Sequence, residues 1–267
     1  MPRTPGSEQA TARADVAVVI PTAGRDSLLR AVRSVYAQDY PGMIQILVGV
    51  DIDLHGRIRA LRDVLTAELP ANRMLTWLDL GYSTSRRHGG VHSCHFGGAL
   101  RTVLTFCAQP ATVLYLDDDD WYAPHHVRAL AAAMAGRRWA FSLCWYADSD
   151  TGTALAVDEI ESVGPDRGVY RERFGGFVRP SALAIDKLAL AHILHLWSHS
   201  PLPGGDGEDR LIFEHLRRVP ERGETGIPSV CYAIDPRDAA HAMRLEFLRA
   251  KGGTFAATAK RDSMRAP

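Results

Sequence analysis

Val113-Leu114-Tyr115-Leu116-Asp117-Asp118-Asp119-Asp120-Trp121 is an apolar run that ends in four consecutive carboxylates. The apolar part is β-branched and aromatic, and it has the length of a buried strand. Four adjacent like charges repel one another and do not enter a core without partners. We therefore expect a strand whose carboxyl end projects acids into a crevice, at the edge where parallel sheets bind ligands.

The four acids have two interpretations. Hard cations such as Mg²⁺ or Mn²⁺ take carboxylate oxygens and often bridge to phosphates, which favours a metal site. The alternative is a solvated acidic turn that caps a helix beginning near Pro124. Because an apolar strand runs directly into Asp117–Asp120, we favour a metal or phosphate site.

Strand and helix patterns alternate on both sides of this stretch. Apolar periodicity predicts helices at about 26–37, 58–67, 98–107 and 124–135. Before, between and after these helices, apolar runs predict strands at 16–20, 44–50, 74–78 and 139–146. This alternation is typical of βαβ units. It predicts an α/β fold with a mostly parallel, Rossmann-like central sheet flanked by helices.

Beyond Asp148 the pattern is less regular. It predicts a hairpin turn at Thr151–Thr153, strands at 177–185 and 229–233, and helices at 187–197, 210–218 and 236–250. We expect a single domain over residues 15–250, with an N-terminal half at 15–122 and a C-terminal half at 123–250. Residues 1–14 are predicted to be a disordered lead-in, and 251–267 a loose tail.

Composition excludes several classes of protein. Lys plus Arg equals Asp plus Glu at 31 each, so the basic excess of a nucleic-acid binder is missing from the 267 residues. No apolar run reaches the length of a transmembrane helix, and the N-terminus lacks the apolar region of a signal peptide. The four cysteines form no C-x-x-C pair. We expect reduced cysteines and a cytoplasmic protein.

Two early strands end in groups suited to a nucleotide. Pro21-Thr22-Ala23-Gly24-Arg25 follows the first strand, and Asp51 and Asp53 follow the second. A carboxylate at a strand end can accept hydrogen bonds from a base or a ribose hydroxyl, whereas helix capping is the alternative. Neither G-x-G-x-x-G nor G-x-x-x-x-G-K-[ST] follows the first strand. The first absence argues against a Rossmann dinucleotide site, and the second excludes a P-loop in its usual form.

Two features late in the sequence contain side chains suited to catalysis or ligand binding. Glu208-Asp209 stands where a glycine-rich loop opens a helix, so these acids either cap the helix or supply a general base. A base held in a partly dry crevice accepts the proton of an attacking hydroxyl. His241 could be a metal ligand or a phosphate donor, with a structural role as the alternative.

The order of these elements resembles the GT-A glycosyltransferases, and among them the large family 2 of nucleotide-sugar-dependent enzymes. Those chains open with a strand ending in a P-T-x-N-R-like stretch, here Pro21–Arg25, followed by Q-x-Y-P, here Gln38–Pro41. Their D-x-D motif, in the form L-D-x-D-D-x-x-x-P, matches Leu116–Pro124. Their late E-D motif matches Glu208-Asp209, and the resemblance covers roughly Val16 to Met243.

The resemblance implies a divalent metal, Mn²⁺ or Mg²⁺. Asp119 would be its principal ligand. Asp117 and Asp118 would contact ribose or metal-bound water, and Asp117 is a further candidate ligand. His241 falls where many members carry a late histidine near the diphosphate, so it is also a candidate ligand.

The resemblance also implies donor-binding and catalytic groups. Asp51 and Asp53 would hold base and ribose, and other donor-binding residues would be Pro21, Thr22, Gly24, Arg25 and His95. Asp209, or Glu208 as the alternative, would be the catalytic base. His95 and Phe96 replace the family's usual Arg and Asn in the pattern A-R-N-x-G. Either His95 substitutes for that arginine, or Arg86 or Arg87 does.

The predicted function is metal-dependent, inverting transfer of a sugar from a nucleotide-sugar, with UDP favoured, to an acceptor hydroxyl. On this interpretation 15–122 is the nucleotide-binding half and 123–250 the acceptor-binding half. The segment 148–176 and the loop 201–207 are expected to face the acceptor, a small molecule or a glycan. A sugar nucleotidyltransferase and a non-catalytic binder of nucleotide-sugar or carbohydrate are the alternatives.

Overall fold

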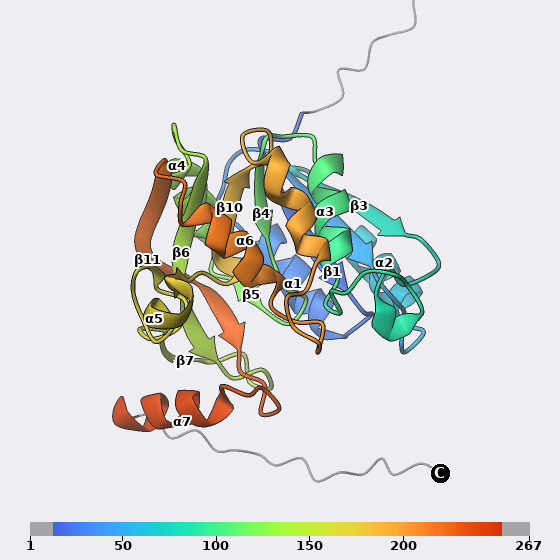
Figure 1. Ribbon diagram of the computed structural model, residues 1–267. Helices are drawn as coiled ribbons and strands as arrows, with labels where there is room; N and C mark the ends of the chain where they lie inside the picture. The colour runs from blue at the N-terminus through green and yellow to red at the C-terminus, as the bar shows by residue number, and fades with distance from the viewer. Residues whose placement is uncertain (1–12, 253–267) are drawn as a thin grey trace, which may run out of the picture.

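The computed structural model describes residues 13–252 and contains one nine-stranded sheet. The strand order is β3-β2-β1-β4-β10-β6-β11-β5, with β7 paired to β6 (Figure 1). The strands are β1 (Val16–Thr22), β2 (Ile44–Val50), β3 (Arg73–Asp79), β4 (Thr112–Tyr115), β5 (Trp121–Tyr122), β6 (Trp139–Ala147), β7 (Ala154–Val157), β10 (Leu183–Asp186) and β11 (Arg222–Ala233). A small second sheet pairs β8 (Gly164–Pro165) with β9 (Gly176–Phe177).

Most strands of the large sheet run in the same direction, as the sequence predicts. β3, β2, β1 and β4 are parallel neighbours, and β11 is parallel to β6. β10 is antiparallel to both β4 and β6, so these two strands still point the same way. The carboxyl ends of β1, β2, β4, β6 and β11 therefore meet at one edge of the sheet.

Helices cover both faces of the sheet. They are α1 (Ser27–Tyr36), α2 (Ile58–Ala67), α3 (Gly98–Cys107), α4 (His126–Ala133), α5 (Arg171–Phe174), α6 (Glu208–Leu216) and α7 (His241–Ala250), with shorter 3₁₀ turns η1 (Arg86–His88), η2 (Pro180–Ala182) and η3 (Ala191–Ser198). In Figure 1, α3 and α6 lie in front of the sheet. On the other face Gln38, just after α1, bonds the backbone of Ala123 and Val127 at α4. None of the described helices is long and apolar enough to cross a membrane.

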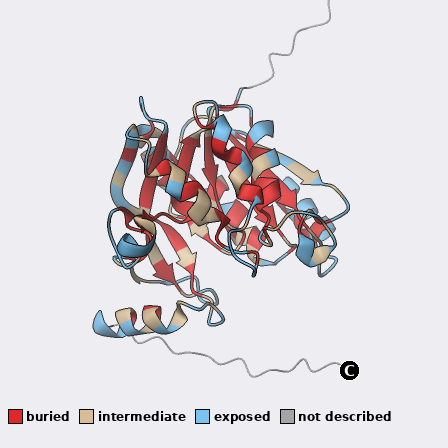
Figure 2. Ribbon diagram, in the orientation of Figure 1, coloured by how far each residue is buried: buried red, intermediate tan, exposed pale blue. Residues whose placement is uncertain are grey.

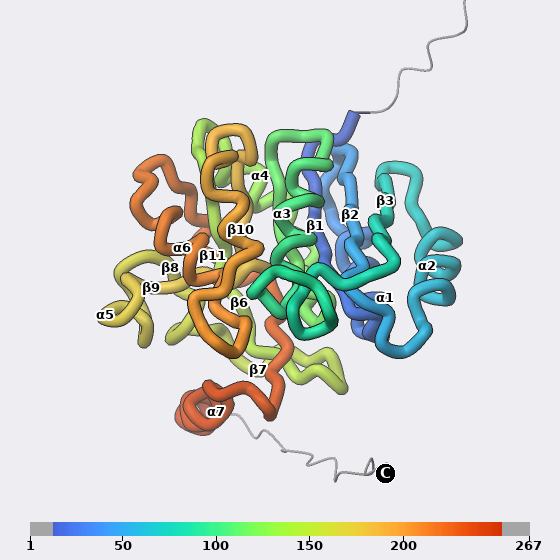
Figure 3. Tube along the Cα trace, turned by 45° about the vertical axis from the view of Figure 1, so that its right-hand side comes forward, coloured from blue at the N-terminus to red at the C-terminus, as the bar shows by residue number. Residues whose placement is uncertain are grey.

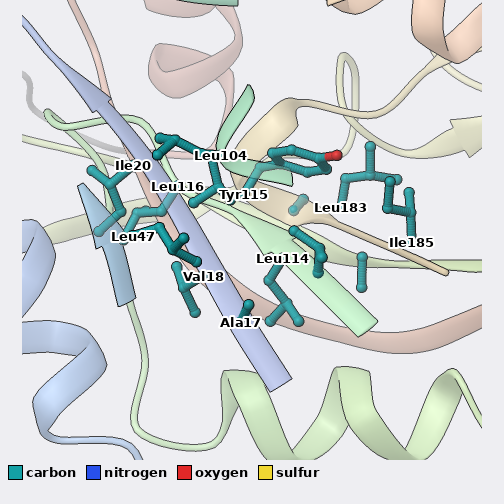
Figure 4. Close-up of a cluster of buried hydrophobic side chains, with 14 of the residues drawn as sticks. Ala17, Val18, Ile20, Leu47, Leu104, Leu114, Tyr115, Leu116, Leu183 and Ile185 are labelled. Atoms are coloured by element: carbon teal, nitrogen blue, oxygen red, sulfur yellow. The ribbon is translucent and has the colours of Figure 1, made fainter. Parts of the chain in front are cut away.

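The core follows the apolar strands of the N-terminal half. Every residue of β1 and of β2 is buried, as expected for strands covered on both faces (Figure 2). Figure 4 shows Val18 and Ile20 of β1 beside Leu47 of β2 and Leu114 of β4. This core fixes the strand ends that carry the predicted nucleotide-binding groups.

α7 packs outside the main sheet, over a smaller core. Leu248 is buried with Tyr146 of β6 and Ile234, and the ring centroids of Tyr146 and Phe247 are 5.9 Å apart. Figures 1 and 3 both show α7 beside β7 and apart from the other helices. The C-terminal half thus ends in a helix anchored on the extensions of β6 and β11.

The structure corrects several predicted elements. The strand expected at 177–185 is interrupted, because Pro180 lacks an N–H and begins η2. The helix expected at 187–197 is only a 3₁₀ segment, since Asp186 accepts hydrogen bonds from the N–H groups of Leu188 and Ala189 and turns the chain. The last helix begins at His241 rather than Pro236.

The hairpin at Thr151–Thr153 is confirmed by the antiparallel pairing of β6 and β7. Cys94, Cys144 and Cys231 are buried and Cys107 is exposed, and all four are free thiols. The predicted lead-in and tail lie outside the described residues, apart from 13–14 and 251–252.

Candidate active site

A cleft of about 1160 Å³ lies at the carboxyl edge of the sheet. Its walls are the segments that follow β1, β2, β4, β6 and β11, together with the first residues of α6. Ten residues that the sequence singles out line it: Pro21, Thr22, Arg25, Asp51, His95, Asp117, Asp118, Asp119, Glu208 and Asp209. Residues about 190 positions apart in the chain therefore share one cavity.

Asp120 is a structural member of the acidic run. It is buried, and its carboxylate accepts hydrogen bonds from Oγ of Ser181 at 2.6 Å and from the N–H of Ala233 at 3.0 Å. These bonds join the acidic run to η2 and to the end of β11. Burial, together with the charges of Asp119 and Asp117, raises the pKa of Asp120 above its ordinary value.

Asp118 is held by the turn that follows β1. Oγ1 of Thr22 donates to Asp118 at 2.6 Å and accepts from the N–H of Gly24 at 3.1 Å. Gly24 has a φ of +77°, and a Cβ there would lie 2.8 Å from Oδ1 of Asp53. The turn thus needs glycine at this position. It places the side chain of the next residue, Arg25, beside Asp118 and Asp119. Burial is the main reason that the pKa of Asp118 is raised.

Asp119 is the most accessible acid of the run Asp117–Asp120. Its side chain is 47% exposed, and Nη1 of Arg25 lies 2.6 Å from Oδ2 of Asp119 and 3.4 Å from Oδ1 of Asp118. The Arg25 side chain is 49% exposed. Asp119 is therefore a carboxylate that a cation from solution can reach.

Arg101 joins the acidic run to the late acids, a role that the sequence analysis missed. Its guanidinium forms ion pairs with Asp117 and, at 3.2 Å, with Glu208, and it donates to the carbonyl of Phe96 at 3.0 Å. The side chain is only 5% exposed. A usable signal existed, because Arg101 lies on the same helical stripe of α3 as the buried Leu104. A buried arginine needs an anionic partner.

Glu208 and Asp209 have different surroundings. They are the first two residues of α6, so both carboxylates stand at the positive end of that helix. Glu208 is buried against Arg101, whereas Asp209 is partly exposed and accepts only a local bond from the N–H of Arg210, at 2.8 Å. Burial raises the pKa of both groups. Of the two, Asp209 is therefore the one suited to receive a proton from a ligand.

Asp51 and His95, two of the predicted donor-binding residues, both line the cleft. Asp51 accepts hydrogen bonds from Oγ of Ser83 and from the N–H of Thr84, which orient its carboxylate. The backbone N–H of His95 donates to the carbonyl of Gly205 at 2.8 Å. A Cβ at Gly205 would lie 2.1 Å from the His95 ring, so the loop before α6 packs directly on this histidine.

Three predicted site residues are not among those that line the cleft. Asp53 instead caps α2, because its carboxylate accepts from the N–H groups of Arg57 at 2.9 Å and Ile58 at 3.2 Å. Gly24 acts through the backbone of its turn. His241 is the first residue of α7.

The C-terminal half contributes groups that the sequence analysis did not identify. Arg179 and Tyr232 line the cleft, and the Arg179 guanidinium stacks on the Tyr232 ring at 3.6 Å. Behind them Glu161 is 1% exposed. It accepts from Arg179 at 2.7 Å and from Nε of Arg244 on α7 at 2.6 Å. We call Glu161, Arg179, Arg244 and Tyr232 the Glu161 cluster. It fixes this wall of the cleft.

The acids at the cleft fit a divalent metal that is shared with a phosphate ligand. Within residues 13–252 no group of three or more His, Cys, Asp or Glu side chains converges into a preformed metal cage. Mg²⁺ and related ions, however, are commonly held by one or two carboxylates plus substrate phosphates. Asp119 and Asp117 offer hard oxygen donors of that kind on the cleft wall.

Comparisons with known proteins give matches among solved structures. No family model and no curated protein matches the chain. TarS from S. aureus has a TM-score of 0.58 at 15% identity, covering 91% of this chain and 40% of TarS. A complex of TarS residues 1–349 with UDP-GlcNAc has a TM-score of 0.57 at 14% identity, covering 84% of this chain and 60% of the other.

A third match is the mannosyltransferase PcManGT from Pyrobaculum calidifontis, in complex with GDP-Man and Mn²⁺. It has a TM-score of 0.55 at 17% identity, covering 90% of this chain and 62% of the other. The chain therefore spans between 40% and 62% of the length of these proteins. The likeness extends over most of the sheet and its helices, and it confirms that the chain has the GT-A fold of glycosyltransferases.

Proposed function

We propose that the chain is a metal-dependent glycosyltransferase that moves a sugar from a nucleotide-sugar, with UDP the favoured nucleotide, to an acceptor hydroxyl with inversion. The observation that carries this proposal is that one cleft contains both the acids after β4 and the pair Glu208-Asp209 on α6. The buried Arg101 links the two groups, because it pairs with both Asp117 and Glu208. Proteins with this fold are solved with UDP-GlcNAc or with GDP-Man and Mn²⁺.

The donor would lie along the ends of β1, β2 and β4. Asp51 would accept hydrogen bonds from the base or the ribose, and Thr22 and Asp118 would support the neighbouring sugar. Asp119, with Asp117, would hold Mn²⁺ or Mg²⁺. When bound, the metal supplies positive charge at the diphosphate. His241 is left out of this proposed metal site because it is not among the cleft residues.

The transfer step follows from the position of Asp209. The acceptor oxygen forms a bond to the anomeric carbon while the bond from that carbon to the phosphate oxygen breaks. The proton of the hydroxyl goes to the Asp209 carboxylate, and the bonding electron pair leaves with the nucleoside diphosphate. Attack from the face opposite the diphosphate inverts the anomeric centre, through a transition state with oxocarbenium character.

The acceptor would enter from the C-terminal half. Arg179 and Tyr232, the turn at Asp148–Asp150 and the loop before α6 form that side of the cleft. A wall of one arginine and one tyrosine offers hydrogen-bond donors and an apolar ring face to a hydroxylated acceptor. The class of acceptor is a small molecule or a glycan.

The first test is calorimetric titration of UDP and GDP, each with Mn²⁺, Mg²⁺ or EDTA, on the wild type and on Asp119→Ala. We expect binding that requires the metal and is lost in the variant, because the diphosphate would then lack its shared cation. No nucleotide binding under any of these conditions would overturn the proposal at the donor site.

The second test separates catalysis from binding. Asp209→Asn should retain donor binding but lose transfer and donor hydrolysis by about 10²- to 10⁴-fold, the usual range for a general base. Near-normal turnover in this variant would exclude Asp209 as the base. Release of pyrophosphate from a nucleoside triphosphate would favour a nucleotidyltransferase, and binding without any turnover in the wild type would favour a non-catalytic binder.

A further inference from the structure

Arg25 and Arg101 both form ion pairs with the acidic run, and their side chains differ in exposure. Arg101 has a side chain that is 5% exposed and is fixed between Asp117 and Glu208. Arg25 follows the Gly24 turn, and about half of its side chain is exposed. Its ion pairs are with Asp118 and Asp119. Arg25 can therefore leave the acids without unpacking the core, whereas Arg101 cannot.

The Arg25 guanidinium lies where it interferes with a metal on Asp119. Nη1 is 2.6 Å from Oδ2 of Asp119, which is the carboxylate that a divalent cation would have to coordinate. A guanidinium and a divalent cation cannot share that oxygen at close range, because their like charges repel. An ion pair between two half-exposed groups adds little net stability and is readily given up.

We propose that Arg25 is an exchangeable counter-ion of Asp119. It neutralises the acidic run while no metal is bound, and it moves off when a divalent cation takes the carboxylate, which frees its guanidinium for the diphosphate of the donor. The second part of this inference rests on the proposed function, since it assumes a diphosphate ligand; the first part concerns the metal alone. Arg25 then opposes binding of the metal and favours binding of the diphosphate.

The two effects have opposite signs, which makes the inference testable by binding alone. Removing Arg25 relieves the competition at Asp119, so Mn²⁺ added by itself should bind more tightly. The same removal takes one cation from the diphosphate, so UDP should bind more weakly at saturating Mn²⁺. A residue that only supports the local structure would weaken both.

The experiment measures free Mn²⁺ by electron paramagnetic resonance during titration of the wild type, Arg25→Gln and Arg25→Lys. Arg57→Gln is a matched control, because Arg57 is 52% exposed and pairs with Asp26, and neither residue lines the cleft. We expect about fivefold or greater tightening of Mn²⁺ in Arg25→Gln. Arg25→Lys and Arg57→Gln should both stay near wild type, since each keeps the charge beside Asp119.

Unchanged or weaker Mn²⁺ binding in Arg25→Gln overturns the inference, as does the absence of Mn²⁺ binding in both proteins. UDP titrated at saturating Mn²⁺ separates this result from the fate of the proposed function. Tighter Mn²⁺ with no UDP binding in the wild type would keep the exchange at Asp119 and remove the donor site. UDP binding with unchanged Mn²⁺ affinity would do the reverse.

Discussion

Two buried glutamates, Glu208 and Glu161, differ in the number of arginines that neutralise them. Glu208, beside the cleft, shares the single guanidinium of Arg101 with Asp117. Glu161, in the Glu161 cluster, contacts two guanidiniums, those of Arg179 and Arg244. Burial raises the pKa of Glu208, with the charge of Asp209 adding to it. Burial also opposes ionisation of Glu161, but its arginine partners outweigh burial and lower its pKa to about 2.

The difference distinguishes the cleft, where we propose that the reaction takes place, from the Glu161 cluster, which holds side chains in position. A carboxylate with too little compensating charge is poised to gain a proton or a cation, as active-site groups commonly are. A carboxylate with two cations is locked in its ionised form and holds its neighbours in place. At the cleft edge two acids share one guanidinium, whereas Glu161 by itself contacts two guanidiniums, which also pair with Asp158 and Asp238.

The strongest test of this contrast is Arg101→Met. Removal of the shared guanidinium leaves the buried Glu208 and the partly exposed Asp117 without this cation, so the free energy of unfolding should fall by about 3 kcal/mol. Activity should fall as well, because both ends of the cleft lose their common support. Urea denaturation and donor turnover measure the two effects.

Arg73→Met is the control for that variant. Arg73 is equally buried, but it bonds backbone carbonyls, those of Val35 and Gln38, rather than carboxylates. It should lose stability while keeping turnover per folded molecule. Equal loss of turnover in the two variants would remove the special role of Arg101.

Glu161→Gln should show the next largest effect. Glutamine keeps the shape but leaves Arg179 and Arg244 short of charge. Because charged hydrogen bonds are lost, we expect a loss of about 2–3 kcal/mol in unfolding free energy. Donor binding should stay intact, while the KM for the acceptor rises. Glu159→Gln is the control, because Glu159 forms an exposed ion pair with Lys251. This variant should change neither the free energy of unfolding nor the KM for the acceptor.

The same glutamate predicts a pH dependence. The pKa of Glu161 is lowered to about 2, against about 4.3 in an unfolded chain. Its contribution is therefore complete above about pH 4.3 and is lost as the pH falls toward 2. Acid titration of stability should be flatter in Glu161→Gln than in the wild type over that window. Identical acid profiles would contradict the assignment of Glu161 as ionised.

Glu208→Gln should have the opposite sign. The raised pKa of Glu208 means that it stabilises the fold most at low pH, and this contribution is lost as the pH rises through its folded-state pKa. A neutral glutamine avoids that loss and can still accept from Arg101. We expect unchanged stability at about pH 4, below the unfolded-state pKa of about 4.3, and a gain of about 1 kcal/mol above neutrality. A loss as large as that of Glu161→Gln would break the contrast.

Asp53→Asn should have the smallest effect. Its carboxylate caps α2 and does not line the cleft, so we expect a loss of about 1 kcal/mol or less in stability. Affinity for UDP should be unchanged, in contrast to Asp51→Asn, whose carboxylate lines the cleft. Calorimetry of the two variants with UDP and Mn²⁺ makes the comparison. Equal weakening in both would restore Asp53 to the donor site.

The sequence by itself determined the parallel N-terminal half and the edge at which the acids meet. Apolar runs such as Val16–Ile20 and Ile44–Val50 are buried on both faces, so their strand identity is readable without any partner. Polar groups placed directly after such strands, including Thr22, Asp51 and Asp117, must then gather at one edge. The motif order correctly indicated the GT-A fold for the same reason.

Only the tertiary structure decided which of the marked residues reach the cleft and what holds them there. Asp51 and Asp53 both follow β2 within three residues, yet one lines the cleft and the other caps α2, because the chain turns between them. Arg101 and Glu161 take their roles from partners 16 to 107 residues away. Pairing over such distances depends on packed elements rather than on local pattern, so burial and charge balance become visible only once the chain is folded.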